Sequence, residues 1–182
     1  MHEHTGTLDG ARLRIAIVVS RFNRAVTGSL LEGAREGLAA VGVADDDIAV
    51  FHVPGAFEIT VATERCAASG RFDAVVCLGA VIRGETPHFD FIASEVSRGV
   101  GEVSIRHSCP VAFGVLTTDT MEQALARAGR GHGNKGLEAA QTAIEMVRLL
   151  QQIPGAPGAS RPTLAADREF DEPLDAALRN VP

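Results

Sequence analysis

The sequence predicts an α/β fold built around a parallel sheet, and two regularities of the chain support this prediction. Four short apolar runs are separated by longer segments in which apolar residues recur at steps of three and four. The short runs are typical of buried strands, and the longer segments of amphipathic helices. Strands that alternate with helices in this way form a parallel sheet with right-handed crossovers.

The first half of the chain is expected to supply two strands and two helices. The first strand covers 13–20, and Asn23 is a candidate N-cap for the helix after it. This helix carries one apolar stripe, which consists of Val26, Leu30, Ala34, Leu38 and Val41. Gly42 suits the end of the helix because glycine readily adopts the left-handed conformation. The second strand, 48–53, is followed by a helix over about 56–69.

The second half repeats the pattern. A strand over 75–82 is separated by a polar turn from a helix over 89–106, and the fourth strand covers 109–117. Two residues are candidates to cap the next helix, Thr118 and Asp119. That helix is expected to end near Ala128, and the last helix covers about 137–152.

From Pro154 the composition changes to a proline-bearing linker, PGAPGASRP, followed by twenty residues with only a weak helical pattern. We therefore expect a folded domain over 1–153 and a flexible C-terminal tail over 154–182.

Composition and charge exclude several classes of protein. The net charge of −6 disfavours nucleic-acid binding, and no apolar run reaches the ~18–20 residues of a membrane span. The polar opening segment is not a signal peptide. Cys66, Cys77 and Cys109 lack metal-ligand spacing, so we expect reduced core thiols in a cytoplasmic protein. The three aspartates at 45–47 are expected to be a solvated turn rather than a metal site.

A candidate ligand site follows the third strand. Gly84, Glu85, Thr86 and Pro87 form a polar turn that ends at His88, where a helix is expected to begin. Backbone N–H groups and a hydroxyl at a helix start can bind an anion, and a nearby imidazole can exchange protons near neutral pH. The alternative is a structural or solvated histidine. The other five histidines have weaker contexts.

An aromatic residue follows each of the first three expected strands. Phe22, Phe57 and Phe89 all lie at turns after apolar runs, which indicates a site with aromatic walls for a planar ring. Ordinary packing at a corner is the alternative for each ring. Glu58 is either an acid that favours the first turn of its helix or an acceptor for ligand hydroxyls.

Two cations flank a glycine-rich loop later in the chain. Arg127 and Lys135 could clamp a phosphate and a second ligand, or could interact with helix ends and solvent. The loop lacks the spacing of a Walker-type P-loop, and no GxGxxG follows a strand, so a dinucleotide is not indicated.

Six segments, in matching order and spacing over about 12–152, resemble the lumazine synthase family, the penultimate enzymes of riboflavin biosynthesis. The segments are RFN at 21–23, VPGAFEI at 53–59, CLGAVIRGETPHFD at 77–90, FGVLTTDT at 113–120, EQALARAG at 122–129 and GNKG at 133–136. The resemblance implies a three-layer α/β/α sandwich with a four-stranded, parallel, flavodoxin-like sheet. Thr60 departs from the proline that many members carry.

The resemblance also implies a transferase reaction. The family condenses 5-amino-6-(D-ribitylamino)uracil with 3,4-dihydroxy-2-butanone 4-phosphate, without a metal or an organic cofactor. His88 would transfer protons. The implied substrate-binding residues are Phe22, Ala56, Phe57, Glu58, Ala80, Val81, Ile82, Glu85, Thr86, Phe113, Arg127 and Lys135.

Members of the family form pentamers with active sites between subunits, and some assemble twelve pentamers into a hollow icosahedral 60-mer. Phe113 and Arg127 are placed less directly for the site of their own chain, so we expect them to serve a neighbouring copy. The short loop over 129–136 resembles the shell-forming members. The resemblance leaves three alternatives for the assembly: a pentamer, a decamer and a 60-mer. It also suggests riboflavin synthase as a partner that a shell would enclose. Two alternatives to the enzyme are a non-catalytic flavin or lumazine carrier and a shell-forming protein on the same fold.

Overall fold

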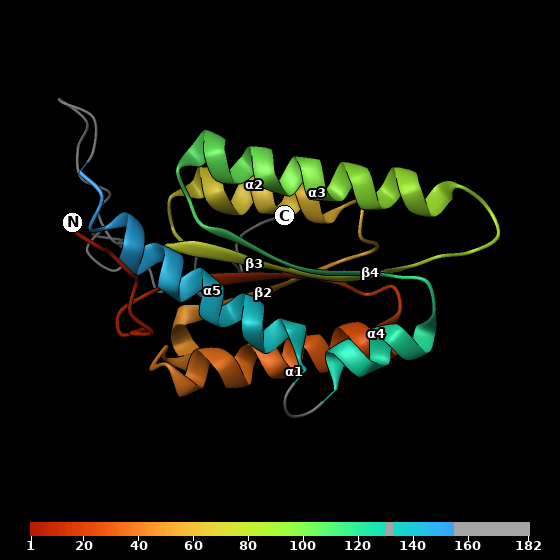
Figure 1. Cartoon of the computed structure of the whole chain (residues 1–182), viewed down its shortest axis with the longest axis horizontal. Helices are drawn as coiled ribbons and strands as arrows, with labels where there is room; N and C mark the ends of the chain where they lie inside the picture. Colours follow the sequence, from red (N-terminus) through yellow and green to blue (C-terminus); the bar gives the residue numbers. More distant parts are fainter. Residues whose placement is uncertain (130–132, 155–182) are drawn as a thin grey trace.

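The computed structural model describes residues 1–129 and 133–154, and these residues form a four-stranded parallel sheet between two layers of helices (Figure 1). The strands are β1 (Ile15–Ser20), β2 (Ile48–Val53), β3 (Ala74–Ile82) and β4 (Val111–Thr118). The helices are α1 (Arg24–Ala40), α2 (Ile59–Ser69), α3 (His88–His107), α4 (Met121–Ala128) and α5 (Lys135–Leu150), with a short 3₁₀ helix at Asp45–Asp47.

The two helical layers cover opposite faces of the sheet. α2 and α3 lie on one face, and α1, α4 and α5 lie on the other (Figure 1). The predicted three-layer, flavodoxin-like α/β/α architecture is therefore confirmed. The expected tail lies outside the described residues, apart from Pro154.

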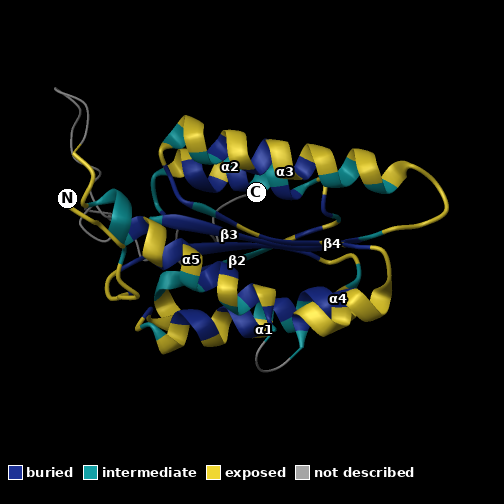
Figure 2. Cartoon of the chain, in the orientation of Figure 1, coloured by how far each residue is buried: buried dark blue, intermediate teal, exposed yellow. Residues whose placement is uncertain are grey.

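The core explains why the apolar runs form strands. β1 is buried along its whole length, and the strands form the dark central layer of Figure 2. Ile15, Ile17 and Val19 pack with α1 and α5, while Ala16 and Val18 pack with α2 and α3. Alternate side chains thus point to opposite faces, and each face must be apolar because a helical layer covers it.

The strand order is β2-β1-β3-β4. The chain leaves β1 for the neighbour on one side and then crosses to β3 on the other side, so the topology reverses between β1 and β3. In open α/β sheets this reversal opens a crevice beyond the carboxyl ends of the strands, where ligands bind.

Two of the predicted caps are corrected by the structure. Asn23 does occupy the N-cap position of α1, but it has a left-handed backbone with φ 57° and its side chain makes no capping hydrogen bond. The cap of α4 is neither Thr118 nor Asp119. It is Thr120, whose hydroxyl accepts a hydrogen bond from the Gln123 N–H at 3.2 Å.

Two helix starts also differ from the prediction. α2 begins at Ile59 rather than at Ala56, because residues 56–58 remain in the turn after β2. α5 begins at Lys135, two residues early, because Asn134 caps it through bonds from two N–H groups, those of Gly136 and Leu137. Gly42 and Gly70 have the positive φ angles that helix-ending glycines favour, 88° and 64°.

Thr60, the position that departs from the family pattern, lies where α2 meets α3. A Cβ on Gly99 would come within 2.5 Å of Thr60 Cγ2, so the two helices approach closely at this point. None of the helices in the described part of the chain is both long and apolar enough to cross a membrane.

Candidate active site at the carboxyl ends of the strands

A cavity of about 510 Å³ lies at the carboxyl ends of β1, β2 and β3, at the topological reversal. It is lined by Phe22, Asn23, Gly55, Ala56, Phe57, Glu58, Ala80, Val81, Ile82, Gly84, Thr86, His88, Phe89 and Ile92. We call this the strand-end cavity. It brings together most of the site residues expected from the first half of the chain.

The turn after β1 holds one aromatic wall in place. The Phe22 N–H donates to Ser20 Oγ at 3.1 Å, and Asn23 Nδ2 donates to the Ala80 carbonyl at 3.0 Å. This second bond ties the end of β1 to β3. The Phe22 ring is 67% exposed, so it is available to a ligand rather than to the core.

The turn after β2 supplies a second ring and a carboxylate. Phe57 is 57% exposed and lines the cavity together with Glu58. A Cβ on Gly55 would lie 2.9 Å from Glu58 Oε2, so the carboxylate lies directly over the glycine backbone. A side chain at position 55 would push Glu58 away, which explains the glycine.

The third wall is the turn between β3 and α3. Gly84 and Thr86 line the cavity, and the exposed His88 is the first residue of α3. Pro87 precedes this helix with φ −68°, a position that its missing N–H allows. Glu85 belongs to the same exposed turn but is outside the lining residues. The free N–H groups at the start of α3 make this wall suitable for an anion.

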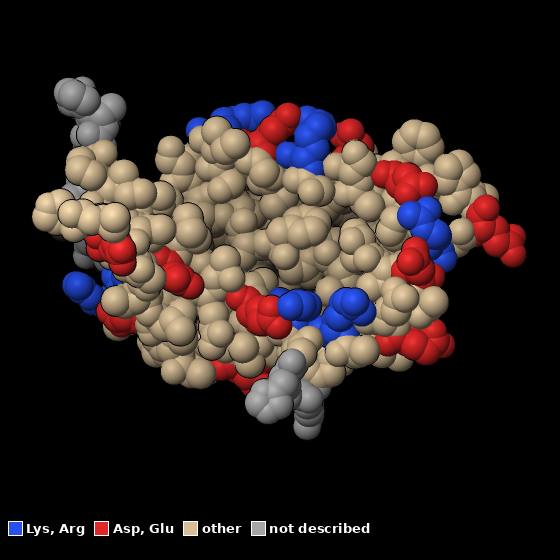
Figure 3. Space-filling model, in the orientation of Figure 1, with Lys and Arg blue, Asp and Glu red and all other residues tan. Residues whose placement is uncertain are grey.

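Phe113, Arg127 and Lys135 are not in the strand-end cavity. They line a second cavity of about 360 Å³ between β4 and α5, which we call the β4 cavity. Arg127 Nη1 donates to the Gln123 carbonyl at 3.0 Å, and Lys135 Nζ lies 2.6 Å from Glu138 Oε2. Figure 3 shows basic and acidic groups side by side in the lower central part of this face.

The prediction missed three lining residues, Asn23 as a wall of the cavity, Gly55 and Ile92. Ile92 follows His88 by four residues on α3, so the helical repeat could have placed both on one face. Asn23 was read as a cap, and its bond to the Ala80 carbonyl depends on strand order, which the local sequence does not contain.

The described residues contain no cluster of three or more side chains that could hold a metal ion. The three cysteines, all within the described residues, are buried and form no disulfide. Burial raises the pKa of the Cys77 thiol to about 12, and that of Cys66 likewise to about 12. Both thiols therefore stay protonated at neutral pH and are poor nucleophiles.

Fold and cavity together define a class: a flavodoxin-like α/β protein with a cavity at its strand ends. The family model for 6,7-dimethyl-8-ribityllumazine synthase matches residues 12–151. A protein of Protochlamydia amoebophila (strain UWE25) named 6,7-dimethyl-8-ribityllumazine synthase is 51% identical over 153 residues, which cover 84% of this chain and 89% of that protein. The chain belongs to the 6,7-dimethyl-8-ribityllumazine synthase family.

Proposed function

We propose that this chain condenses 5-amino-6-(D-ribitylamino)uracil with 3,4-dihydroxy-2-butanone 4-phosphate to give 6,7-dimethyl-8-ribityllumazine, releasing phosphate and water. Family membership supports this activity. The observation that carries it is the composition of the strand-end cavity. It combines two exposed rings, a carboxylate and an anion-binding turn with an imidazole beside it.

Each wall suits one part of the reactants. Phe22 and Phe57 would contact the uracil ring, with Ala56 beside them, and Glu58 would accept hydrogen bonds from the ribityl hydroxyls. Backbone groups of the β3 end, 80–82, would bind the edge of the ring. The turn that carries Glu85 and Thr86 would hold the phosphate of the second substrate.

The reaction proceeds from this arrangement in three steps. The primary amine attacks the ketone and loses water to form a Schiff base, and phosphate leaves by elimination as a proton is lost. The ribityl-bearing nitrogen then attacks the carbonyl that remains and loses a second water as the second ring closes. Much of the acceleration would come from holding two reactants in contact, an effect worth up to ~7–11 kcal/mol. His88 lies where it could move protons in these steps.

We also propose that the site is completed by a second copy of the chain. The β4 cavity is lined by Phe113, Arg127 and Lys135, among others. It has no lining residue in common with the strand-end cavity. A neighbouring copy that placed its β4 cavity against the strand-end cavity would add a ring and two cations where the phosphate lies. A pentamer is the assembly that supplies this contact in turn to every copy, and a shell of pentamers would extend it.

We also propose a cytoplasmic location, which three buried thiols without a disulfide support, because such thiols stay reduced there.

The test is an absorbance assay with both substrates and the purified chain. Appearance of the lumazine chromophore, with one phosphate released per turnover, is the expected result. Binding of the ribitylaminouracil without turnover would instead identify a carrier. Arg127→Ala should raise KM for the phosphorylated ketone and lower kcat, and unchanged values would remove Arg127 from the site.

A further inference from the structure

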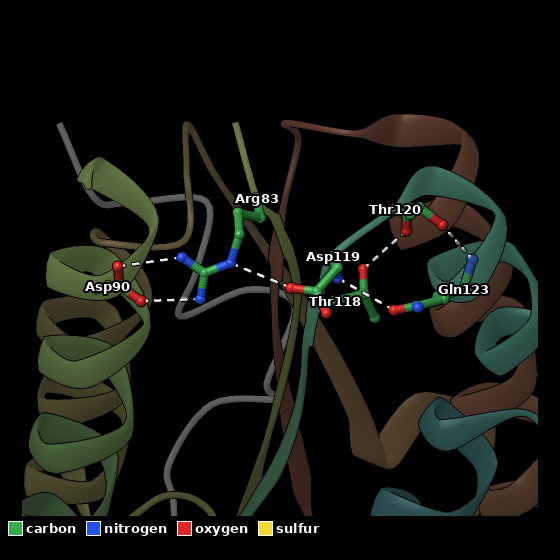
Figure 4. A network of polar contacts seen from close by, with 6 residues as sticks. All are labelled: Arg83, Asp90, Thr118, Asp119, Thr120 and Gln123. Carbon is green, nitrogen blue, oxygen red and sulfur yellow. Dashed lines mark hydrogen bonds and ion pairs between the residues drawn. The ribbon is translucent and has the colours of Figure 1, made fainter. Parts of the chain in front are cut away.

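Arg83 is the first residue after β3, and its side chain bridges two neighbouring elements (Figure 4). Nη1 and Nη2 donate to the two carboxylate oxygens of Asp90 at 3.1 and 3.0 Å, in the first turn of α3. Nε donates to Asp119 Oδ1 at 3.1 Å, in the connection from β4 to α4. All three guanidinium nitrogens are thus engaged by carboxylates.

The same guanidinium contacts a wall of the strand-end cavity from outside. Its central carbon lies 4.1 Å from the centroid of the Phe89 ring, and Phe89 lines the cavity. The Arg83 N–H also donates to the Thr118 carbonyl at 2.9 Å, which joins the ends of β3 and β4. Arg83 itself is not among the lining residues, so it would act on a ligand through its neighbours.

The bond from Arg83 to Asp90 closes a short loop around the polar turn at 84–87. Arg83 precedes that turn, and Asp90 lies two residues beyond His88. Fixing both ends of a short segment removes most of its conformational freedom. The bond therefore restricts the backbone of the turn and of the helix start that carries His88.

The second carboxylate is itself held by the cap of α4. The Asp119 N–H donates to Gln123 Oε1 at 3.1 Å, and the Gln123 N–H donates to Thr120 Oγ1 (Figure 4). This reciprocal pair resembles a capping box and fixes the backbone at Asp119. Through Asp119, Arg83 connects the turn before α3 to the start of α4.

Stability alone does not account for this network. Arg83 is 42% exposed, and its two acidic partners are 59% and 69% exposed. Exposed ion pairs contribute little free energy, whereas a bidentate arginine–carboxylate pair fixes direction. The two bonds from Arg83 to Asp90 are therefore better suited to fixing the position of the helix start than to stabilising the fold.

We propose that Arg83 is a positioning residue: it holds the polar turn at 84–87, which would bind the phosphate, and His88 in their reactive arrangement. This inference rests on the proposed function. In Arg83→Gln we expect about tenfold increases in KM for the phosphorylated ketone and in the inhibition constant of inorganic phosphate, with kcat about tenfold lower. KM for the ribitylaminouracil should change by less than about twofold, because its rings and carboxylate lie in the turns after β1 and β2 and the β3 residues 80–82 are held by the sheet.

Two further variants test the geometry. Arg83→Lys keeps the charge and loses the planar fork, so it should recover only part of the phosphate affinity. Asp90→Asn should reproduce the effect of Arg83→Gln, and the double variant should be no worse than either single one, since all remove the same bond. Arg35→Gln is the matched control, because Arg35 carries an exposed ion pair to Asp45 at 2.9 Å on α1.

The possible outcomes are distinct. A wild-type chain without turnover would refute the proposed function. The wild type could instead be active while Arg83→Gln and Asp90→Asn melt at lower temperatures but keep the wild-type inhibition constant of phosphate. That result would refute the positioning role of Arg83 and leave the proposed function standing. Full recovery in Arg83→Lys, or multiplicative effects in the double variant, would overturn the requirement for the bidentate bond.

Discussion

At the scale of single residues, we expect the proposed chemistry to centre on one exposed histidine at the start of a helix. His88 shares the strand-end cavity with Phe22, Glu58 and Thr86, which lie on three separate connections. A ring, a carboxylate and a hydroxyl thus meet around one imidazole. Histidine is suited to move protons near neutral pH, but the pairing of the reactants does not depend on it.

His88→Ala should therefore slow the reaction without abolishing it. General acid–base catalysis contributes about 10²- to 10⁴-fold, so kcat should fall by a factor in this range while both KM values change little. Steady-state kinetics with both substrates measures this directly.

His52→Ala is the matched control for this variant, because His52 is exposed on β2 and lies outside the strand-end cavity. It should retain wild-type kinetics. Complete loss of turnover in a folded His88→Ala protein would show that the imidazole does more than assist.

The sequence located His88 and the exposed rings because each follows an apolar run, and runs of this kind end at one edge of a parallel sheet. The roles of Asn23 and Arg83 could not be inferred in this way. Their partners, the Ala80 carbonyl and Asp119, lie on other strands or connections, 57 and 36 positions along the chain. Such contacts depend on the strand order.

At the scale of elements, Asn134 joins three helices. Its Nδ2 donates to the Ser29 and Ala128 carbonyls at 2.9 and 3.0 Å, and its Oδ1 caps α5. The side chain is 6% exposed, and a Cβ on Gly33 would lie within 2.4 Å of it. A single amide thus links α1, the end of α4 and the start of α5.

Asn134→Ala should lower the free energy of unfolding by about 2–4 kcal/mol. The lost cap costs about 1 kcal/mol, and the buried N–H and carbonyl groups left unpaired add the remainder. Chemical denaturation measures the change.

Thr120→Ala removes the exposed cap of α4 and serves as the comparison. It should cost only about 0.5–1 kcal/mol. Equal effects in the two variants would show that Asn134 acts as a cap and nothing more.

The pairing of α2 with α3 gives a pH dependence. A hydrogen bond from His107 Nε2, at 2.9 Å, together with Arg106, holds the pKa of the Glu64 carboxyl below its ordinary value of 4.5. A carboxyl with a lowered pKa in the folded state stabilises the fold above pH 4.5, and this contribution is lost as pH falls through the lowered value.

Glu64→Gln should therefore differ most from the wild type near pH 6, and the difference in denaturation midpoint should shrink toward pH 3. Glu36→Gln, at an exposed position on α1, provides the control and should show no such convergence. A gap that stays constant from pH 6 to pH 3 would mean that the pairing does not involve the ionised carboxylate.

The helices and strands were largely predictable because their periodicity is local. All four strands overlap the expected runs, while the starts of α2, α4 and α5 differ from the prediction by one to three residues. These starts depend on which polar side chain finds a partner, as at Thr120 and Asn134. Periodicity does not record that choice.

At the scale of the whole molecule, one chain separates what the reaction must bring together. The strand-end cavity holds the rings and the imidazole, and the β4 cavity holds Phe113, Arg127 and Lys135. The sequence predicts this separation for Phe113, near the start of the fourth strand, and for Arg127, at the end of the helix after it, but not for Lys135. A neighbouring copy, as we propose, resolves it.

Subunit complementation tests this central claim most directly. His88→Ala leaves the β4 cavity intact, and Arg127→Ala leaves the strand-end cavity intact. If the two cavities meet across subunits, mixed assemblies of the two variants contain sites with neither substitution, roughly a quarter of the total at equal ratio. The two proteins should be denatured together, refolded together and assayed for lumazine formation. We predict that turnover rises to about a quarter of the wild-type rate, well above that of either variant alone. A mixed sample no more active than the average of the two separate variants would contradict the account.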